Sequence, residues 1–380
     1  MKLRSSVSQF TFDPATFAQL SAALRAGSLS PESAKLSDPP RPLGDAETGV
    51  LRSPLRLERS QAAIAAMRAG KLGVLVLNGG MATRFGGVPK GIVPVLEDHD
   101  ESFLFLKLAQ ILAAEREFDA QIPVTLMHSF ATRRASDEHL KKIRWAGLCA
   151  ERCHSFDQSI MPRVTPDGSP IAERADANDL SDTQLYSAPG HGDTLRMLRL
   201  SGVLAKLRAQ GVEHLLVSNV DNLGASADPR VFSAHLEACA AGAAMSVEVV
   251  RREPDDAGGC IACVEERPVI VEGFRLPKES DLSRFPHFNT NTLWFDLAAL
   301  EEPLSLSWFP VHRSLPVTKG ETIPMVQFEQ LIGQATELLP ANYIEVEREA
   351  RFLPIKTRDD LRAAAPSMAA RIAATQRHPS

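Results

Sequence analysis

The hydrophobic pattern of the chain becomes regular after Lys71. From there on, short apolar runs alternate with longer segments whose apolar residues recur at helical spacing. Continuous apolar runs of this length fit strands that are buried on both faces, and their alternation with helices predicts a Rossmann-like α/β fold with a mostly parallel sheet and helices on both faces. The expected strands are 73–77, 123–128, 214–220 and 245–250, and the expected helices are 102–117, 136–146, 193–210 and 229–241.

The rest of the chain is less regular. Residues 1–60 hold polar, helix-like pieces and a stretch rich in proline and serine at 28–54, so we expect an irregular arm on the main domain. Residues 61–345 should form that main domain, with short strands at 258–295 as an antiparallel extension. Residues 346–380 should form a helical C-terminal extension.

Composition narrows the classes of partner. The chain has 380 residues, of which 44% are hydrophobic and 23% are charged, as in an ordinary globular protein. A formal net charge of -5 gives no basic field for nucleic acid, and no run approaches the roughly 18 apolar residues that span a bilayer. The N-terminus lacks the apolar core of a secretory signal. We therefore expect a cytoplasmic protein with neither nucleic-acid nor membrane partners.

The five cysteines are too unevenly placed to make a disulfide framework. Cys260 and Cys263 form one C-x-x-C pair, and Cys149 with Cys153 forms a looser one that lacks nearby histidines at zinc-finger spacing. One pair cannot fill a tetrahedral zinc site. We interpret the cysteines as ordinary reduced side chains of the core.

The first candidate site is a glycine-rich loop within residues 74–90. An apolar run there breaks at Gly79 and Gly80, and the loop ends at Pro89 and Lys90. Glycines let backbone amides approach a polyphosphate closely, and the lysine adds a mobile positive charge. The loop matches neither the dinucleotide-binding motif nor the P-loop motif. An ordinary glycine-rich turn after a strand is the alternative.

A second candidate is Asp221, at the carboxyl end of the strand expected at 214–220. Ligands of open α/β sheets bind at this edge. A carboxylate is a hard ligand suited to magnesium, and a nucleotide polyphosphate would supply further oxygen ligands. A helix cap or Asx-turn is the alternative role for an aspartate that follows a strand.

Two glycines flank His191 in the segment 187–193, directly before an amphipathic helix. This predicts another loop of close approach, and we expect Asp193 to cap the helix. The apolar stripe of that helix is assigned to the core, not to a cofactor site, and consists of Met197, Leu200, Leu204 and Leu207.

Bulky and polar side chains alternate along 288–295. On a strand this alternation would place Asn289 and Asn291 on one face, where paired amides suit sugar hydroxyls. The solvent face of a half-buried strand is the alternative interpretation.

Taken in order, the motifs of this chain resemble those of the UTP-glucose-1-phosphate uridylyltransferase family, the eukaryotic-type UDP-sugar pyrophosphorylases. The resemblance covers about residues 73–360. Each motif is weak alone, but their shared order is specific. The motifs are Leu77–Gly80 with Pro89–Lys90, Ser155–Ser159, Pro189–Asp193, Val217–Gly224, Phe288–Trp294, Gln327–Glu329 and Arg351–Thr357.

The resemblance implies a role for each matching residue. Lys90 would hold the UTP phosphates, Lys319 would be the second phosphate-binding lysine, and His191 would approach the sugar phosphate. Asp221 would bind Mg2+. The nucleotide would lie against Leu77, Asn78, Gly79, Gly80, Gln158, Pro189 and Gly190. The sugar pocket would be lined by Asn219, Glu272, Asn289 and Asn291.

The implied fold is nucleotidyltransferase type A-like, and the implied reaction forms a UDP-sugar and pyrophosphate from UTP and a hexose 1-phosphate. Glucose 1-phosphate is the expected sugar, and its phosphate oxygen would attack the α-phosphorus of UTP in line, with magnesium assisting. The alternatives are a UDP-N-acetylhexosamine or other UDP-sugar pyrophosphorylase, and a sugar-nucleotide-binding protein without turnover.

The chain departs from the family pattern at two places. Ala257 stands where the family has a lysine before a Gly-Gly pair, and Arg251, Arg252 and Lys278 are the nearby cations that could substitute. Family members also continue into a β-helix domain beyond the Arg351 motif, and we expect none here. The oligomeric state therefore stays open, with a monomer among the options.

Overall fold

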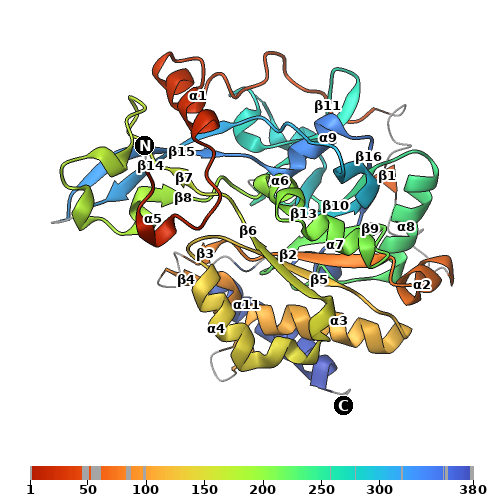
Figure 1. Ribbon diagram of the computed structural model, residues 1–380. Coiled ribbons are helices and arrows are strands. Elements are labelled where there is room, and N and C mark those ends of the chain that lie inside the picture. Colours follow the sequence, from red (N-terminus) through yellow and green to blue (C-terminus); the bar gives the residue numbers. More distant parts are fainter. Residues whose placement is uncertain are drawn as a thin grey trace.

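The computed structural model describes residues 2–44, 51–52, 61–82, 87–96, 100–256, 258–278, 280–317, 320–353, 355 and 358–376. A large central sheet with helices on both sides dominates it (Figure 1), which confirms the predicted α/β class. The strand order is β1-β16-β10-β13-β9-β2-β5-β6. Their bounds are β1 Leu51–Arg52, β2 Leu72–Leu77, β5 Val124–His128, β6 Cys153–Asp157, β9 His214–Asn219, β10 Met245–Arg251, β13 His287–Asp296 and β16 Ala341–Glu345.

Strand β2 shows why the central strands are continuously apolar. Its side chains alternate between two cores: Val74 and Val76 face one, and Leu75 and Leu77 face the other. The first core is covered by α2 Gln61–Arg68, α3 Phe103–Phe118, α4 Arg133–Ile143, α8 Pro229–Ala240 and α11 Arg358–Gln376. The second is covered by α6 Asp193–Leu200, α7 Val203–Ala209 and α9 Ala335–Leu338.

One strand of the sheet runs against the others. β13 pairs antiparallel with both β10 and β9, so it lies inside the main sheet and not beyond its edge. The chain reaches it from β10 through the hairpin of β11 Cys260–Val264 and β12 Arg267–Val271, and β11 also pairs with β13. The predicted antiparallel extension is therefore present, but its last strand belongs to the central sheet.

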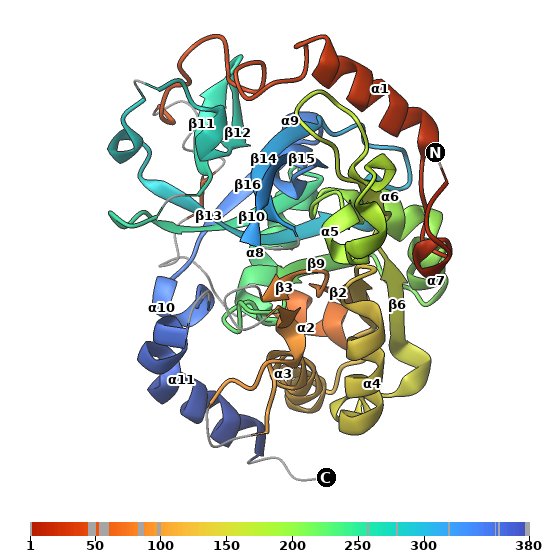
Figure 2. The same cartoon turned by 90° about the vertical axis from the view of Figure 1, so that its left-hand side faces the viewer.

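Two further parts, a hairpin and the helix α1, lie outside the central sheet (Figure 2). A hairpin of β14 Phe309–Pro316 and β15 Thr322–Glu329 carries α1 Pro14–Arg25, whose Phe17 and Leu20 pack against Val326 and Phe328. The remaining short elements are β3 Met81–Ala82, β4 Val88–Pro89, β7 Met161–Pro162, β8 Tyr186–Ser187, α5 Asp182–Leu185 and α10 Arg348–Arg351.

Two predicted elements need correction. The helix expected at 193–210 is two helices, because Gly202 between α6 and α7 has a left-handed φ of +76°. The break turns Leu200 outward to 54% exposure, so it is not part of the core stripe that contains Met197 and Leu204. The glycine-rich loop after β2, for which an ordinary turn was the alternative, leads into the antiparallel β3–β4 pair.

Within the part of the chain that the structure describes, no helix combines the length and the apolar character needed to cross a membrane.

Candidate active site

The candidate site lies along the edge of the sheet where the parallel strands β2, β5, β6 and β9 end. Ordered backbone bonds tie the loops there to one another. Val220 N donates to Leu77 O at 3.2 Å, Asn78 N to Met127 O at 2.8 Å, and Gln158 N to His128 O at 2.8 Å. The polar residues that follow these strands are therefore held close together, as ligand sites of open α/β sheets require.

Three of the predicted nucleotide-binding residues meet in one place. Gln158 Nε2 donates to Gly190 O at 2.6 Å, and its Oε1 lies so close to Gly79 that a side chain there would overlap it. Gly190 has a left-handed φ of +78°, and a Cβ on it would lie 2.5 Å from Gln330 O. Glycine is thus required at 190 by close approach to the Gln330 backbone and by backbone conformation, whereas at 79 a side chain would displace the Gln158 amide.

Gln330, directly after β15, holds the loop around Gly190 in place. This role of Gln330 was not predicted from the sequence. Gln330 N donates to Pro189 O, and Gln330 O accepts from Gly192 N, both at 2.8 Å. Its side chain donates to Leu306 O at 2.8 Å. The Gln327–Glu329 motif directly precedes Gln330 in the sequence, and that proximity is the signal that could have revealed this role.

The other predicted nucleotide-binding residues contribute backbone or packing. Leu77 lies in the core at 6% exposure, and Asn78 is fully buried. Asn78 Nδ2 donates to Ser136 Oγ at 2.9 Å and lies 3.2 Å from His128 Nδ1, so its side chain points toward α4. Gly80 is exposed, and its carbonyl accepts from Lys90 N at 3.1 Å.

Asp193 does not cap α6 as predicted. Its Oδ2 accepts from Ser159 N at 2.7 Å and from Ser159 Oγ at 2.9 Å, and its Oδ1 lies 3.4 Å from Arg196 Nη1. The carboxylate therefore links the loop around His191 to the loop that carries Gln158. Burial raises the pKa of Asp193, while the hydrogen bonds from Ser159 act in the opposite direction.

Lys90 and Asp221 form a direct ion pair between Lys90 Nζ and Asp221 Oδ2. The Lys90 side chain is 20% exposed and the Asp221 side chain is 12% exposed. Asp221 therefore lies in a largely buried position, in contact with Lys90. Lys319, the other predicted catalytic lysine, lies outside the described residues.

The predicted sugar-binding asparagines meet at a bulge. Asn291 Nδ2 donates to Asn219 Oδ1 at 3.1 Å, and Asn291 N donates to Asn289 Oδ1 at 3.0 Å. The register of β13 against β10 shifts between Glu248 and Val249, and Asn291 has a left-handed φ of 56°. Simple alternation on one face is therefore wrong for this pair. A β-bulge brings the amides together, and asparagine tolerates the left-handed region better than most residues.

Glu272 is connected to these asparagines through Gly259. Its carboxylate is next to Gly259, where a Cβ would lie 3.1 Å from Oε1, and Gly259 O accepts from Asn289 N at 2.9 Å. Burial raises the pKa of Glu272, and Arg275 opposes that shift. The structure thus brings all four predicted sugar residues to neighbouring positions.

His191 is held as a neutral hydrogen-bond donor. Its Nδ1 accepts from Ile332 N at 3.0 Å, and burial lowers its pKa to about 4. At neutral pH the ring proton is therefore on Nε2. The residue can donate one hydrogen bond to an anionic group, but it does not act as a cation.

Two of the three cations proposed to replace the missing family lysine have other partners. Arg251 Nη2 lies 3.1 Å from Glu345 Oε2, and Arg252 Nη1 donates to Asp256 O at 2.6 Å. Arg252 also lies over the ring of Phe288, 5.4 Å from its centroid. Lys278 is exposed. Ala257 itself lies outside the described residues.

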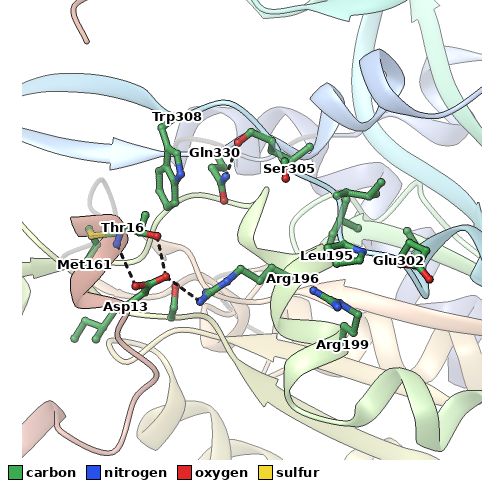
Figure 3. A pocket seen from close by; sticks show the side chains of 16 residues that line it. Asp13, Thr16, Met161, Leu195, Arg196, Arg199, Glu302, Ser305, Trp308 and Gln330 are labelled. Atoms are coloured by element: carbon green, nitrogen blue, oxygen red, sulfur yellow. Dashed lines mark hydrogen bonds and ion pairs between the residues drawn. The ribbon is translucent and has the colours of Figure 1, made fainter. Parts of the chain in front are cut away.

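A pocket of about 280 Å³ lies behind the nucleotide loop and contains none of the predicted site residues (Figure 3). Arg196 and Trp308 lie on its walls, and Gln330 and Ser159 connect it to the loop of Gly190. Thr16 Oγ1 donates to Asp13 Oδ2 at 2.8 Å on its other side. The start of α1 thus forms one side of the pocket, where Asp13 contacts both Thr16 and Arg196.

The cysteines are free thiols. Cys239 lies near His214 and His235 at the amino-terminal edge of β9, opposite the candidate site, and these three side chains come within 4.8 Å of one another. His235 Nδ1 lies 2.9 Å from Ser246 Oγ, and the His235 ring is 6.0 Å from that of Trp294. We interpret this group as a packed aromatic cluster, as its hydrogen bond and ring contacts indicate.

A model of the UTP-glucose-1-phosphate uridylyltransferase family matches residues 44–371. The chain is 34% identical over 303 residues to UTP-glucose-1-phosphate uridylyltransferase of Saccharomyces cerevisiae, a match that covers 77% of the chain and 58% of the yeast protein. The enzyme of the same name from Solanum tuberosum is 31% identical, with 77% of the chain and 60% of that protein covered. The chain thus spans less than two thirds of the length of these relatives.

Two solved structures share the fold. UDP-glucose phosphorylase from Trypanosoma brucei matches with a TM-score of 0.74 and 26% identity, covering 91% of this chain and 73% of that one. A mutant UDP-glucose pyrophosphorylase from Leishmania major in complex with UDP-glucose matches with a TM-score of 0.72 and 25% identity, covering 91% and 74%. Given the extent of the family match and the identity to these relatives, the chain belongs to the UTP-glucose-1-phosphate uridylyltransferase family.

Proposed function

We propose that this protein joins UTP and glucose 1-phosphate to form UDP-glucose and pyrophosphate. The observation that carries the proposal is the placement of Lys90, Asp221, His191 and the Asn219–Asn291 pair at one sheet edge, beside the Gly79–Gln158 contact. A phosphate site, a neutral donor, paired amides and a close-approach loop are the parts that a sugar nucleotidyltransferase needs. Residues 61–345 would form the catalytic unit.

The nucleotide side would recognise uracil through backbone and amide groups. Gly79 allows a base to approach the main chain, and Gln158 is already oriented by its bond to Gly190 O. An amide side chain held in one direction presents a fixed donor and acceptor, which suits the edge of a base. This side would bind UTP before chemistry and keep the α-phosphate in place.

The reacting groups are both anionic, so charge compensation is the main task. The phosphate oxygen of the sugar attacks the α-phosphorus in line, its bond to phosphorus forms, and the bond to the pyrophosphate oxygen breaks with its electron pair. Lys90 would neutralise charge on the triphosphate, and Lys319 is the proposed second cation. No covalent intermediate on the protein is required, because the sugar phosphate is itself the nucleophile.

The Asp221 side chain suits the role of a magnesium ligand. It is a single carboxylate at the ligand edge of the sheet, and Mg2+ commonly binds proteins through one or two carboxylates together with substrate phosphates and water. In this structure Lys90 balances its charge. When bound, the ion would neutralise phosphate charge and orient the triphosphate.

The sugar side would act through neutral hydrogen bonds. His191 Nε2–H would donate to a phosphate oxygen, and its low pKa keeps it neutral near pH 7. Asn219, Asn289 and Asn291 offer both donors and acceptors to sugar hydroxyls.

The test is pyrophosphate release by the purified chain with UTP, Mg2+ and a panel of sugar 1-phosphates. Glucose 1-phosphate should give the highest kcat/KM, and Lys90→Met should abolish most of the turnover. Lys71→Met is the matched control, because Lys71 pairs with Glu213 at the other end of the strands. No release with any sugar would refute the proposed enzyme, and a preference for N-acetylglucosamine 1-phosphate would refute its sugar.

A further inference from the structure

We propose that Asn222 is a positioning residue that sets the place of Asp221 through a buried network with Thr292 and the Arg351–Leu353 segment. The inference deepens the proposed function and rests on it. Asn222 follows Asp221 directly and is only 2% exposed. Its side chain bonds to Thr292, Gly224 and Leu353, none of which is a predicted ligand-binding residue. It therefore acts through its neighbour.

The side chain of Asn222 joins three separate parts of the chain. Its Oδ1 accepts from Leu353 N at 3.0 Å and from Gly224 N at 3.2 Å, and its Nδ2 donates to Thr292 Oγ1 at 3.3 Å. A primary amide is the side chain that supplies an acceptor for two backbone groups and a donor on the other side. The turn after β9 is thus attached to the C-terminal segment and to β13 at the same residue.

The C-terminal segment holds this turn at two more points. Gly224 packs directly on the backbone of Arg351, so that any side chain at 224 would overlap it. Arg351 Nη1 donates to Ser226 O and to Ser226 Oγ, both at 3.0 Å. The loop 221–226 therefore cannot move without breaking contacts with residues 351–353.

A buried ion pair anchors Arg351 in turn. Arg351 Nε lies 2.9 Å from Glu248 Oε2 and Nη2 lies 2.5 Å from Oε1, with the two side chains 5% and 1% exposed. Trp294 Nε1 donates to Glu248 Oε1 at 2.9 Å. Because the pair is bidentate, it fixes the orientation of the Arg351 guanidinium. A buried ion pair supports such an orienting role better than it supports a gain in stability.

The same network reaches the sugar side. Thr292 N lies 3.3 Å from Thr290 Oγ1, and Thr290 Oγ1 donates to Glu248 O at 2.7 Å. These bonds hold the ends of the bulge that contains Asn291. One buried set of polar groups thus sets the distance between the carboxylate of Asp221 and the amides of the sugar pocket.

The experiment compares Asn222→Ala with Asn342→Ala. Asn342 is also a buried asparagine, but it lies on β16, and its Nδ2 has no hydrogen-bond partner among the described residues. Asn222→Ala should lower kcat about a hundredfold, the typical effect of misplacing reacting groups by about 1 Å, with KM for UTP within threefold. It should also weaken binding of Mn2+ alone at least fivefold, measured from the spin-resonance signal of the free ion. Asn342→Ala should change none of these values.

A second pair keeps the inference testable if Asn222→Ala does not fold. Thr292→Val removes the acceptor of Asn222 Nδ2 while keeping the side-chain shape, and Thr292→Ser keeps the hydroxyl. The valine variant should lower kcat at least tenfold and weaken Mn2+ binding, and the serine variant should restore both.

The outcomes separate this inference from the proposed function. Equal Mn2+ affinity and kcat in the wild-type chain and Asn222→Ala, or no Mn2+ binding to the wild-type chain, would overturn the positioning role. Equal loss in Thr292→Val and Thr292→Ser would also overturn it. Absence of pyrophosphate release by the wild-type chain, with the Mn2+ difference intact, would overturn only the proposed function.

Discussion

The two halves of the candidate site are built in different ways. On the nucleotide side, glycines bring backbone and Gln158 into contact, and the neighbouring bonds run between main-chain groups of the Gly190 and Gln330 loops. On the sugar side, the positions depend on side chains such as Asn219, Asn291 and Asn222 that meet across distant strands. Where main-chain groups form the site, added side-chain volume is poorly tolerated. Where side chains form it, the loss of a single hydrogen-bonding atom is costly.

Lys90 lies where the two halves meet, so its loss should have the largest effect. Lys90→Ala should lower kcat by about two orders of magnitude or more, as expected for a preorganised charge that stabilises a transition state. Uracil recognition should survive, because Gln158 and Gly79 remain. Initial-rate kinetics and equilibrium UTP binding measure both quantities. A variant that keeps kcat, or one that fails to fold, would show that the Lys90–Asp221 pair is structural.

Added side-chain volume at Gly190 should disrupt the nucleotide side of the site. Gly190→Ala introduces a Cβ 2.5 Å from Gln330 O at a left-handed φ, and we expect UTP binding to weaken at least about tenfold, equivalent to about 1.4 kcal/mol. Gly202→Ala is the matched control, since Gly202 has a φ of +76° with nothing within 4 Å of its Cβ position. Equal UTP affinity in the two variants would contradict the close-approach role of Gly190.

Loss of the Asn291 side-chain amide should weaken sugar binding. Asn291→Gly keeps the left-handed backbone and removes the bond to Asn219, so KM for glucose 1-phosphate should rise about tenfold, as for one lost hydrogen bond. Asn291→Ala should raise KM similarly and also lower the free energy of unfolding by about 1 kcal/mol relative to the glycine variant. Chemical denaturation separates the two effects. Unchanged KM in both variants would remove Asn291 from the sugar pocket.

Acid should destabilise the fold through its buried histidines, two of which lie on the nucleotide side. Burial lowers the pKa of His128 to about 3 and that of His191 to about 4, both below the usual value of 6.5. These side chains bind protons more readily when unfolded, so their stabilising contribution is full above pH 6.5 and is lost as the pH falls toward 4. One such histidine costs on the order of 2 kcal/mol at pH 5.

The variant His128→Asn should therefore show a shallower loss of unfolding free energy between pH 7 and pH 5 than the wild-type chain. His312→Asn, at an exposed residue of β14, should keep the wild-type slope. Parallel pH profiles for all three chains would show that His128 is not the source of the acid sensitivity.

The two halves also differ in how well sequence predicts them. The glycine-rich loop and Gly190 could be identified because close approach requires particular residue types in a short segment, whereas Gln158 followed only from the family resemblance. The position of Asp221 after an apolar strand was equally readable. The Asn291 bulge and the role of Asn222 could not be derived, because both depend on register shifts and contacts with residues at least 40 positions away.

The fold shows the same division. Strands β2, β5, β9 and β10 follow from local hydrophobic runs, since buried parallel strands have a continuous apolar sequence. The short strand β6 and the hairpin β14–β15 have mixed polar sequences and were not predicted, because their pairing partners, not their composition, define them. The break at Gly202 depends on a single backbone conformation.

The most direct test of the account is a set of initial rates with UTP and glucose 1-phosphate both varied, in the wild-type chain and in Gln158→Ala and Asn291→Gly. Gln158→Ala should raise KM for UTP about tenfold with little change for glucose 1-phosphate, and Asn291→Gly should do the reverse. Equal changes in both KM values for either variant, or a wild-type chain without turnover, would contradict this account.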